Sequence, residues 1–178
     1  MKDATDKIIN KKLVKKYGKD LNVVYIPLHE TGSVFLKDAF KISGFTNVDI
    51  VKSQDDKNGE FKTVKYPNPE SKAAFDEALK LAIKKDADIV VATDQDAHRL
   101  GTYIKVSKGK YLPLTGNELP IIILEYILYF AKINNKNFKK CYAVKSFVTT
   151  RMIDGICNRY GVKLITTLTG FKWIVKRF

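Results

Sequence analysis

One stretch of the sequence, residues 87–99, constrains the fold of this 178-residue chain more than any other. It opens with an apolar, β-branched run at residues 89–92, whose length is typical of a buried strand rather than of a helix. The run then becomes polar abruptly, with Asp94, Asp96 and His98 at alternate positions. Open α/β sheets bind ligands at the carboxyl ends of their strands. The stretch therefore predicts an α/β fold with a candidate site directly after a buried strand.

The chain before and after this stretch alternates predicted strands and helices. Apolar runs at residues 22–26 and 48–51 flank a helical pattern that begins at Ser33. Strand, helix and strand in that order are typical of a parallel sheet with a crossover helix. A second helical pattern covers residues 70–84. Residues 101–106 follow the polar loop so closely that we expect them to return as an antiparallel strand.

A turn at residues 107–110 marks the predicted boundary between two units. The second unit should begin with a helix opened by a capping box of Thr115 and Glu118. This helix is apolar nearly all round, so we expect it to be buried on more than one side. Two strands with a helix between them follow within residues 141–165. The predicted fold class is α/β: two consecutive three-layer units with mixed, mostly parallel sheets and crossover helices, the second unit truncated.

Composition narrows the classes of partner. The formal net charge is +13, which invites a nucleic-acid interpretation, but only four of the 32 basic residues are arginines and the lysines are scattered along the chain. Base recognition depends strongly on arginine, so we expect an anionic small molecule rather than nucleic acid. No run reaches the roughly 18 apolar residues of a membrane span. With no signal-peptide pattern and two cysteines whose spacing does not fit a metal site, we expect a cytoplasmic protein with reduced thiols and no membrane partner.

The polar loop allows three chemical interpretations. Carboxylates at alternate loop positions can converge on one divalent cation, either Mg²⁺ or, because His98 adds an imidazole, Mn²⁺ or Zn²⁺. Arg99, beside them, can hold a phosphate in a bidentate contact. The loop can equally be a polar turn capped by its aspartates. Finally, haloacid-dehalogenase-type phosphatases also begin with an apolar strand that ends in Asp-x-Asp. In that interpretation Asp94 would be the nucleophile.

Five segments, in order along nearly the whole chain, resemble the α-D-phosphohexomutase family. Thr-Asp-Gln-Asp-Ala-His-Arg-Leu-Gly at residues 93–101 is similar to the family's metal loop. Leu-His-Glu-Thr-Gly within residues 25–33 and Pro-Asn-Pro-Glu within residues 63–70 are similar to two further family segments, and Leu-Thr-Gly-Asn at residues 114–117 to the start of its third domain. Residues 167–174 resemble the branch that contains phosphoglucomutase-2-type enzymes and phosphopentomutases.

The resemblance implies a phosphoglucomutase/phosphomannomutase-type isomerase. Such an enzyme moves a phosphoryl group between the 1 and 6 (or 5) positions of a sugar phosphate through a phosphoserine and Mg²⁺. Residues 1–106 would be domain II, which carries the metal loop, and residues 107–178 the start of domain III. The phosphoserine loop, the sugar loop and the fourth domain have no match in these residues. We therefore expect an internal fragment that is inactive alone and whose partners include the missing domains.

The resemblance also assigns roles to single residues. Asp94 and Asp96 would be Mg²⁺ ligands, and His98 stands where the family has a third aspartate. Arg99 would contact the phosphoserine or a bound phosphate and so act in catalysis. Because neutral imidazole suits Mg²⁺ poorly, we expect weak Mg²⁺ binding that improves in His98→Asp. The resemblance also implies that three residues of the second unit bind substrate: Lys145, Gly170 and Phe171.

Overall fold

The structure is a computed structural model that describes residues 9–28, 33–55, 68–94, 96 and 98–177. Parts of three of the segments that resemble the family, within residues 25–33, 63–70 and 93–101, lie outside the described residues. The chain divides into two compact units, Met1–Thr115 and Gly116–Phe178. Each unit is described by itself.

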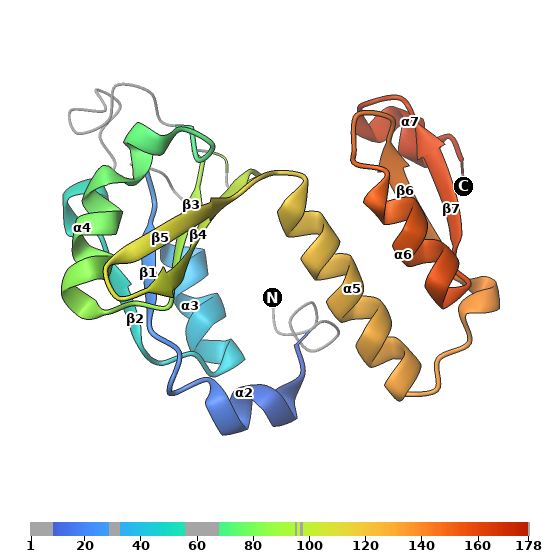
Figure 1. Cartoon of the computed structure of the whole chain (residues 1–178). Helices are drawn as coiled ribbons and strands as arrows, with labels where there is room; N and C mark the ends of the chain where they lie inside the picture. The colour runs from blue at the N-terminus through green and yellow to red at the C-terminus, as the bar shows by residue number, and fades with distance from the viewer. Residues whose placement is uncertain (1–8, 29–32, 56–67, 95, 97, 178) are drawn as a thin grey trace. The chain divides into compact units, whose positions relative to one another are not determined.

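The first unit is built on a five-stranded mixed sheet (Figure 1). Its strands are β1 (Val23–Ile26), β2 (Val48–Ile50), β3 (Ile89–Thr93), β4 (Leu100–Ser107) and β5 (Lys110–Leu114). They lie in the order β2-β1-β3-β4-β5. β1 pairs in parallel with β2 and β3, whereas β3 with β4 and β4 with β5 are antiparallel. The predicted α/β fold and the antiparallel return after the polar loop are confirmed.

Helices cover both faces of this sheet. They are α2 (Lys11–Tyr17), α3 (Ser33–Ser43) and α4 (Asp76–Lys85), with short 3₁₀ turns η1 (Lys52–Gln54) and η2 (Lys72–Phe75). Alternate residues of β1 face different helices: the ring of Tyr25 lies against Phe40 of α3, with ring centroids 6.3 Å apart, whereas Val24 belongs to the core that includes Ala78 of α4. All four β1 residues are buried. A central strand covered on both sides by helices is expected to read as a continuous apolar run.

Strand β5 is the element that the sequence pattern missed. The predicted boundary turn at residues 107–110 lies inside a β4–β5 hairpin. β5 contains Pro113, which argues against a central strand but is tolerated here because β5 is an edge of the sheet. By its contacts, the first compact unit includes β5 and extends to Thr115.

The side chain of Tyr111 ties β5 to the helical layer. Its hydroxyl donates to the carbonyl oxygens of Ala82, at 3.0 Å, and Ala87, at 2.6 Å. These carbonyls lie at the end of α4 and in the connection to β3, and the Ala82 carbonyl also accepts from the Ala87 N–H at 2.9 Å. Burial raises the pKa of the Tyr111 hydroxyl. The hydroxyl of one edge residue thus adds a donor to the hydrogen bonds that end α4.

The second unit contains a two-stranded parallel sheet. Its elements are α5 (Glu118–Ile133), η3 (Phe138–Lys140), β6 (Tyr142–Ser146), α6 (Met152–Tyr160), β7 (Lys163–Thr167) and α7 (Phe171–Val175). Its core consists of five buried residues: Leu128, Ile153, Ile156, Cys157 and Val162. Cys157 is fully buried and reduced, and burial raises the pKa of its thiol. That cysteine is a packing residue.

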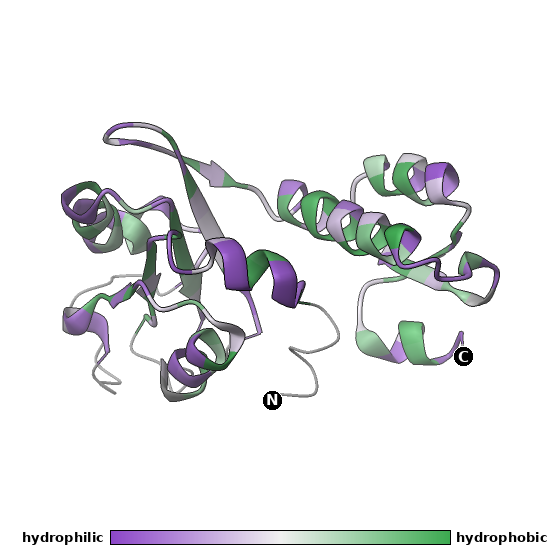
Figure 2. Ribbon diagram, turned by 90° about the horizontal axis from the view of Figure 1, so that it is seen from below, coloured by the Kyte–Doolittle hydropathy of each residue, from purple (hydrophilic) through white to green (hydrophobic). Residues whose placement is uncertain are grey.

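Helix α5 departs from two expectations. It begins at Glu118 with Asn117, not Thr115, at the N-cap position. The Asn117 side chain accepts a hydrogen bond from the backbone N–H of Thr150 at 3.0 Å and so links the start of α5 to the segment before α6. Figure 2 shows how apolar the helix is. The expected burial on more than one side is wrong, since Ile122 is 52% exposed and Ile123 43%. In the described part of the chain, no helix combines the length and hydropathy of a membrane span.

Candidate metal and phosphate site

The polar loop lies at the carboxyl end of the buried strand β3. Asp94 directly follows Thr93, the last residue of β3, whose side-chain hydroxyl is hydrogen-bonded to the Tyr25 hydroxyl of β1 at 2.8 Å. β1 and β3 run in parallel, so both carboxyl ends lie at one edge of the sheet. This is the edge at which open α/β sheets bind their ligands.

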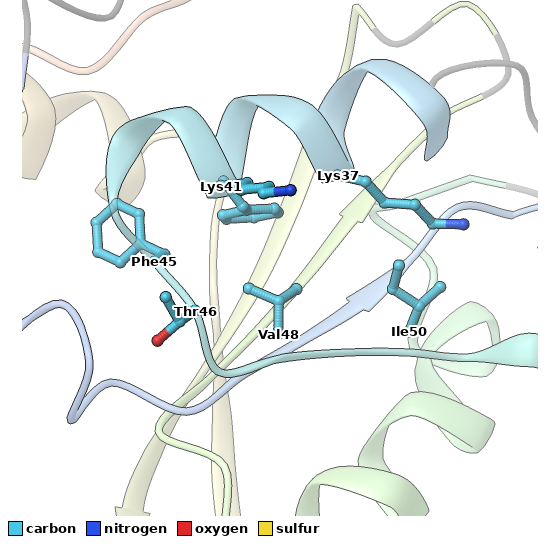
Figure 3. A pocket seen from close by; sticks show the side chains of 7 residues that line it. Lys37, Lys41, Phe45, Thr46, Val48 and Ile50 are labelled. Atoms are coloured by element: carbon cyan, nitrogen blue, oxygen red, sulfur yellow. The ribbon is translucent and has the colours of Figure 1, made fainter.

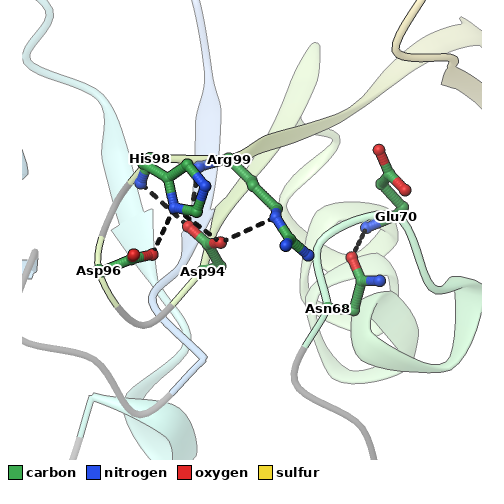
Figure 4. Close-up of polar contacts among 6 residues, drawn as sticks. All are labelled: Asn68, Glu70, Asp94, Asp96, His98 and Arg99. Atoms are coloured by element: carbon green, nitrogen blue, oxygen red, sulfur yellow. Dashed lines mark hydrogen bonds and ion pairs between the residues drawn. The ribbon is translucent and has the colours of Figure 1, made fainter. Parts of the chain in front are cut away.

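Asp94 organises the loop. The residue is only 7% exposed, and its Oδ1 accepts two backbone hydrogen bonds, from His98 N–H at 3.0 Å and from Arg99 N–H at 2.8 Å. A buried carboxylate is costly to desolvate unless it is hydrogen-bonded in this way. These bonds close the loop around Oδ1 and leave Oδ2 as the oxygen that faces the rest of the cluster (Figure 4).

His98 brings a nitrogen between two carboxylates. Its Nδ1 lies 2.6 Å from Asp96 Oδ1 and 3.4 Å from Asp94 Oδ2. Asp96 and His98 are both exposed, and their hydrogen bond holds the pKa of the Asp96 carboxyl below its ordinary value. One ligand atom from each of the three residues lies within 4.8 Å of the other two. The three side chains predicted as ligands are therefore brought together, although residues 95 and 97 lie outside the described part.

The donor set suits a divalent cation that accepts a nitrogen ligand better than it suits Mg²⁺. Two carboxylates and one imidazole supply three protein ligands with a combined charge of −2, and a dication would neutralise that charge. Mg²⁺ takes oxygen ligands in octahedral geometry, however, and the nitrogen of His98 does not belong to that preference. The residues present can hold a dication, with one nitrogen among its ligands.

Arg99 provides the cationic group beside the cluster. Its Nε lies 3.5 Å from Asp94 Oδ2, and its side chain is 54% exposed. Figure 4 shows it extending away from Asp96, on the side of the Asn68–Glu70 turn. A guanidinium anchored at one edge keeps further N–H donors for a phosphate. Arg99 thus lies beside the three candidate ligands, as its position in the sequence predicted.

A second loop packs against the start of β4. The Asn68 side chain accepts a hydrogen bond from the N–H of Glu70 at 2.9 Å and so forms a local turn. The carbonyl oxygen of Pro69 approaches Gly101 so closely that a Cβ there would lie 1.9 Å from it. The sequence pattern did not predict the contact between Pro69 and Gly101. The Pro-Asn-Pro-Glu segment was the one feature of the sequence that could have indicated it.

Lys145 and Asp154 form a pair inside the second unit. The Lys145 side chain is 7% exposed, forms an ion pair with Asp154, and donates to the carbonyl oxygen of Thr150 at 3.2 Å. The hydrogen bond from Lys145 lowers the pKa of the Asp154 carboxyl. The sequence pattern did not identify Asp154, since its position in α6 carries no signal that links it to β6.

The two other predicted substrate residues form an exposed turn after β7. Gly170 has φ +118° and ψ 140° at the start of α7, a conformation that L side chains rarely adopt. Phe171 is 81% exposed. Lys145 lies on β6, so all three substrate candidates lie at or beyond the carboxyl-terminal halves of the parallel strands of the second unit. The polar loop with the candidate metal ligands belongs to the first unit.

A groove between α3 and β2 is a separate feature (Figure 3). It has a volume of about 330 Å³, and its lining is apolar with two lysines, Lys37 and Lys41. Lys37 is paired with Asp55 at 2.6 Å. None of the predicted site residues lines this groove.

Two models of one protein family match the chain in succession. Phosphoglucomutase/phosphomannomutase alpha/beta/alpha domain II matches residues 3–107, and alpha/beta/alpha domain III matches residues 115–178. The chain belongs to the phosphoglucomutase/phosphomannomutase family. The resemblance noted in the sequence is confirmed, and the matches support neither the haloacid-dehalogenase nor the nucleic-acid interpretation.

Curated members of the phosphoglucomutase/phosphomannomutase family match with about one third identity. A phosphomannomutase of Mycoplasmoides pirum is 34% identical over 88% of this chain and 28% of its own length. The human phosphopentomutase is 35% identical over 86% of this chain and 26% of its own length. The 178-residue chain thus spans only about a quarter of the length of these two relatives.

Solved structures of family enzymes share the fold. A putative phosphomannomutase from Thermus thermophilus superposes with a TM-score of 0.70 at 22% identity, covering 99% of this chain and 37% of that one. Aspergillus fumigatus N-acetylphosphoglucosamine mutase, solved in complex with GlcNAc-6P and magnesium, gives a TM-score of 0.61 at 15% identity, covering 98% of this chain and 34% of that one. At these identities the likeness shows the fold alone.

Proposed function

We propose that this chain forms the cation-binding part of a sugar-phosphate mutase. The whole protein would move a phosphoryl group between the 1 and 6 positions of a hexose phosphate, or the 1 and 5 positions of a pentose phosphate, through a phosphoserine. The observation that carries the proposal is the cluster of Asp94, Asp96 and His98 at the end of β3, within a match to domain II of the mutase family. The cytoplasmic location stays a prediction.

The cluster would hold the divalent cation of the reaction, for which Mg²⁺ is the ion in one neighbour's structure. When bound, such a cation neutralises charge on a phosphoryl group in transfer. Asp94 positions the loop through its two backbone hydrogen bonds and offers Oδ2, and Asp96 and His98 complete the ligand set. Arg99 orients a phosphate oxygen through its guanidinium.

In the second unit, Lys145, Gly170 and Phe171 remain proposed substrate contacts. Gly170 leaves the backbone of its turn open to a close approach, and Phe171 presents an exposed ring against which a sugar can pack. Lys145 is occupied by Asp154 in this structure, so its contact with substrate would require exchange of that partner.

A turnover assay tests whether these residues suffice for catalysis. We expect the 178-residue chain to show no conversion of glucose 1-phosphate in the presence of glucose 1,6-bisphosphate and either Mg²⁺ or Zn²⁺, because no segment resembling the phosphoserine loop occurs in it. Robust turnover by the chain would contradict the proposal that another part of the protein supplies the nucleophile.

A binding assay tests the role of Arg99. By calorimetry, we expect glucose 1,6-bisphosphate to bind the chain, and Arg99→Met to weaken binding by about tenfold, the value of one charge-assisted contact. Lys110→Met is the matched control, since it removes the same charge from the exposed start of β5. An equal loss of affinity in both variants would mean that Arg99 acts only through the net charge of the chain and makes no specific contact with phosphate.

A further inference from the structure

We propose that the cation site of this chain selects a late first-row transition dication, represented by Zn²⁺, over Mg²⁺, and that His98 is the selecting residue. The inference rests on the proposed function, because it concerns the same cation site. It goes further by naming the class of ion that the donor atoms favour.

The first argument is where the imidazole points. Nδ1 of His98 faces the two carboxylates, at 2.6 Å from Asp96 Oδ1 and 3.4 Å from Asp94 Oδ2. The Asp96 carboxylate can only accept, so in this structure Nδ1 carries the proton of that hydrogen bond. A cation would take the place of this proton and bind the Nδ1 lone pair, with the ring proton on Nε2. The nitrogen therefore lies within the ligand cluster, although the His98 side chain is exposed. A cation held by both carboxylates would lie next to it.

The second argument is the chemistry of the donors. Imidazole nitrogen is a good ligand for Zn²⁺ and its neighbours in the transition series, whereas Mg²⁺ favours oxygen and keeps its waters. Three protein ligands of nitrogen and carboxylate type with one open position are the usual arrangement of catalytic zinc sites. The open position would accept an oxygen of the sugar phosphate.

The third argument is that the carboxylates available to an ion are few. Oδ1 of Asp94 is committed to two backbone N–H groups, so this buried residue offers a single oxygen, Oδ2. Only Asp96 then offers a second carboxylate within the cluster. Mg²⁺ can be held by two carboxylates together with waters and phosphate oxygens. The third protein ligand, the nitrogen of His98, therefore decides the preference between the two ions.

The test is a titration of the folded 178-residue chain with Zn²⁺ and with Mg²⁺, followed by NMR. The chain has only two histidines, so ring nitrogen signals of His98 can be assigned against a His29→Gln variant. The backbone amide of Arg99, which bonds Asp94, reports on the site in every variant. We expect half-saturation by Zn²⁺ at a concentration at least about tenfold lower than by Mg²⁺, with the Zn²⁺-induced shift at His98 Nδ1.

The decisive variant is His98→Asp, which should lower the Zn²⁺-to-Mg²⁺ preference at least about tenfold and strengthen Mg²⁺ binding. Asp38→Asn is the matched control: an exposed carboxylate on α3 whose removal should leave the preference unchanged. Equal affinities in the original chain, an unchanged preference in His98→Asp, or a Zn²⁺ shift confined to residues near Cys141 would each overturn the inference and leave a cation site in place. Failure of both ions to bind the folded chain would overturn the inference and the proposed cation site together.

Discussion

Gly101 shows how little room a single residue has beside the candidate site. A Cβ at this position would lie 1.9 Å from the carbonyl oxygen of Pro69, 2.8 Å from its carbonyl carbon and 2.9 Å from Cζ of Phe75. Two of these atoms are backbone, which cannot rotate away as a flexible side chain can. The requirement for glycine here comes from the close approach of another chain segment, because the φ angle of Gly101 is not positive.

We therefore expect Gly101→Ala to lower the free energy of unfolding by about 2–3 kcal/mol, the cost of forcing extra volume into a packed position. Urea unfolding followed by circular dichroism measures the change. Gly155→Ala is the control, since a Cβ on that helical glycine meets nothing within 4 Å and should stabilise α6 by about 0.5–1 kcal/mol. A Gly101→Ala protein as stable as the original would mean that the Pro69 segment moves freely.

At the same scale, sequence spacing predicted that Asp94, Asp96 and His98 would meet, because alternate positions in a short loop after a strand project into the same space. The spacing could not predict which of the three side chains is buried and which are exposed. Which carboxylate is buried and holds the loop depends on the backbone N–H groups of His98 and Arg99, and these are directed by the path of the chain into β4.

Among the elements, β5 illustrates why local pattern fails at an edge. Its sequence, Lys-Tyr-Leu-Pro-Leu, contains a proline and lacks a clear alternation, yet it pairs because only one side of an edge strand must supply hydrogen bonds. The same limit explains Asn117, whose side chain serves Thr150, 33 positions further along the chain, rather than its own helix. Such long-range partners leave no local signature, whereas β1, β3 and the helical layers carry theirs in the periodicity of their residues.

Because Tyr111 donates to two carbonyl oxygens, we expect Tyr111→Phe to cost about 1–2 kcal/mol of unfolding free energy. Chemical denaturation of the chain, monitored by circular dichroism, provides the measurement. Tyr17→Phe serves for comparison, since Tyr17 is 51% exposed and its hydroxyl should contribute less than about 0.5 kcal/mol. Similar effects of the two substitutions would contradict the role given to the β5 tyrosine.

The Lys145–Asp154 pair makes the second unit sensitive to acid. The hydrogen bond from Lys145 lowers the folded pKa of Asp154, so its stabilising effect is complete above the ordinary aspartate pKa of about 4 and is lost as the pH falls through the lowered value. We expect Asp154→Asn to be less stable than the original at neutral pH, and the difference to shrink below about pH 4.

Fluorescence of Trp173, the only tryptophan in the sequence, follows the unfolding of the second unit in this experiment. Lys145→Met should be milder than Asp154→Asn, because it removes the buried charge instead of leaving it without its carboxylate. If Asp154→Asn and the original chain lost stability in parallel between neutral pH and about pH 2, the ion pair would have no part in acid sensitivity.

For the molecule as a whole, the net charge of +13 has a consequence for stability. Like charges spread over a compact chain repel one another, and salt screens that repulsion. We expect the urea midpoint to rise when NaCl is increased from about 0.05 M to about 0.5 M, where the Debye length falls from about 14 Å to about 4 Å. Loss of exposed ion pairs such as Lys80–Glu77 should offset little of this gain.

A double variant, Lys12→Glu with Lys15→Glu, lowers the net charge by reversing two exposed lysines of α2. Its midpoint should depend less steeply on NaCl than that of the original chain. A midpoint that falls with salt in the original would show that attractive pairs outweigh the general repulsion.

The burial of Asp94 beside exposed Asp96 and His98 has a consequence for how such a site changes over generations. Codons for aspartate and histidine differ by a single nucleotide, so position 98 can exchange a carboxylate for an imidazole in one mutational step. The loop survives that step because its fold is held by backbone groups bound to Asp94, which the exchange leaves untouched. A lineage could therefore sample new metal chemistry here without passing through an unfolded protein, and a directed-evolution library confined to positions 96 and 98 would exploit the same freedom.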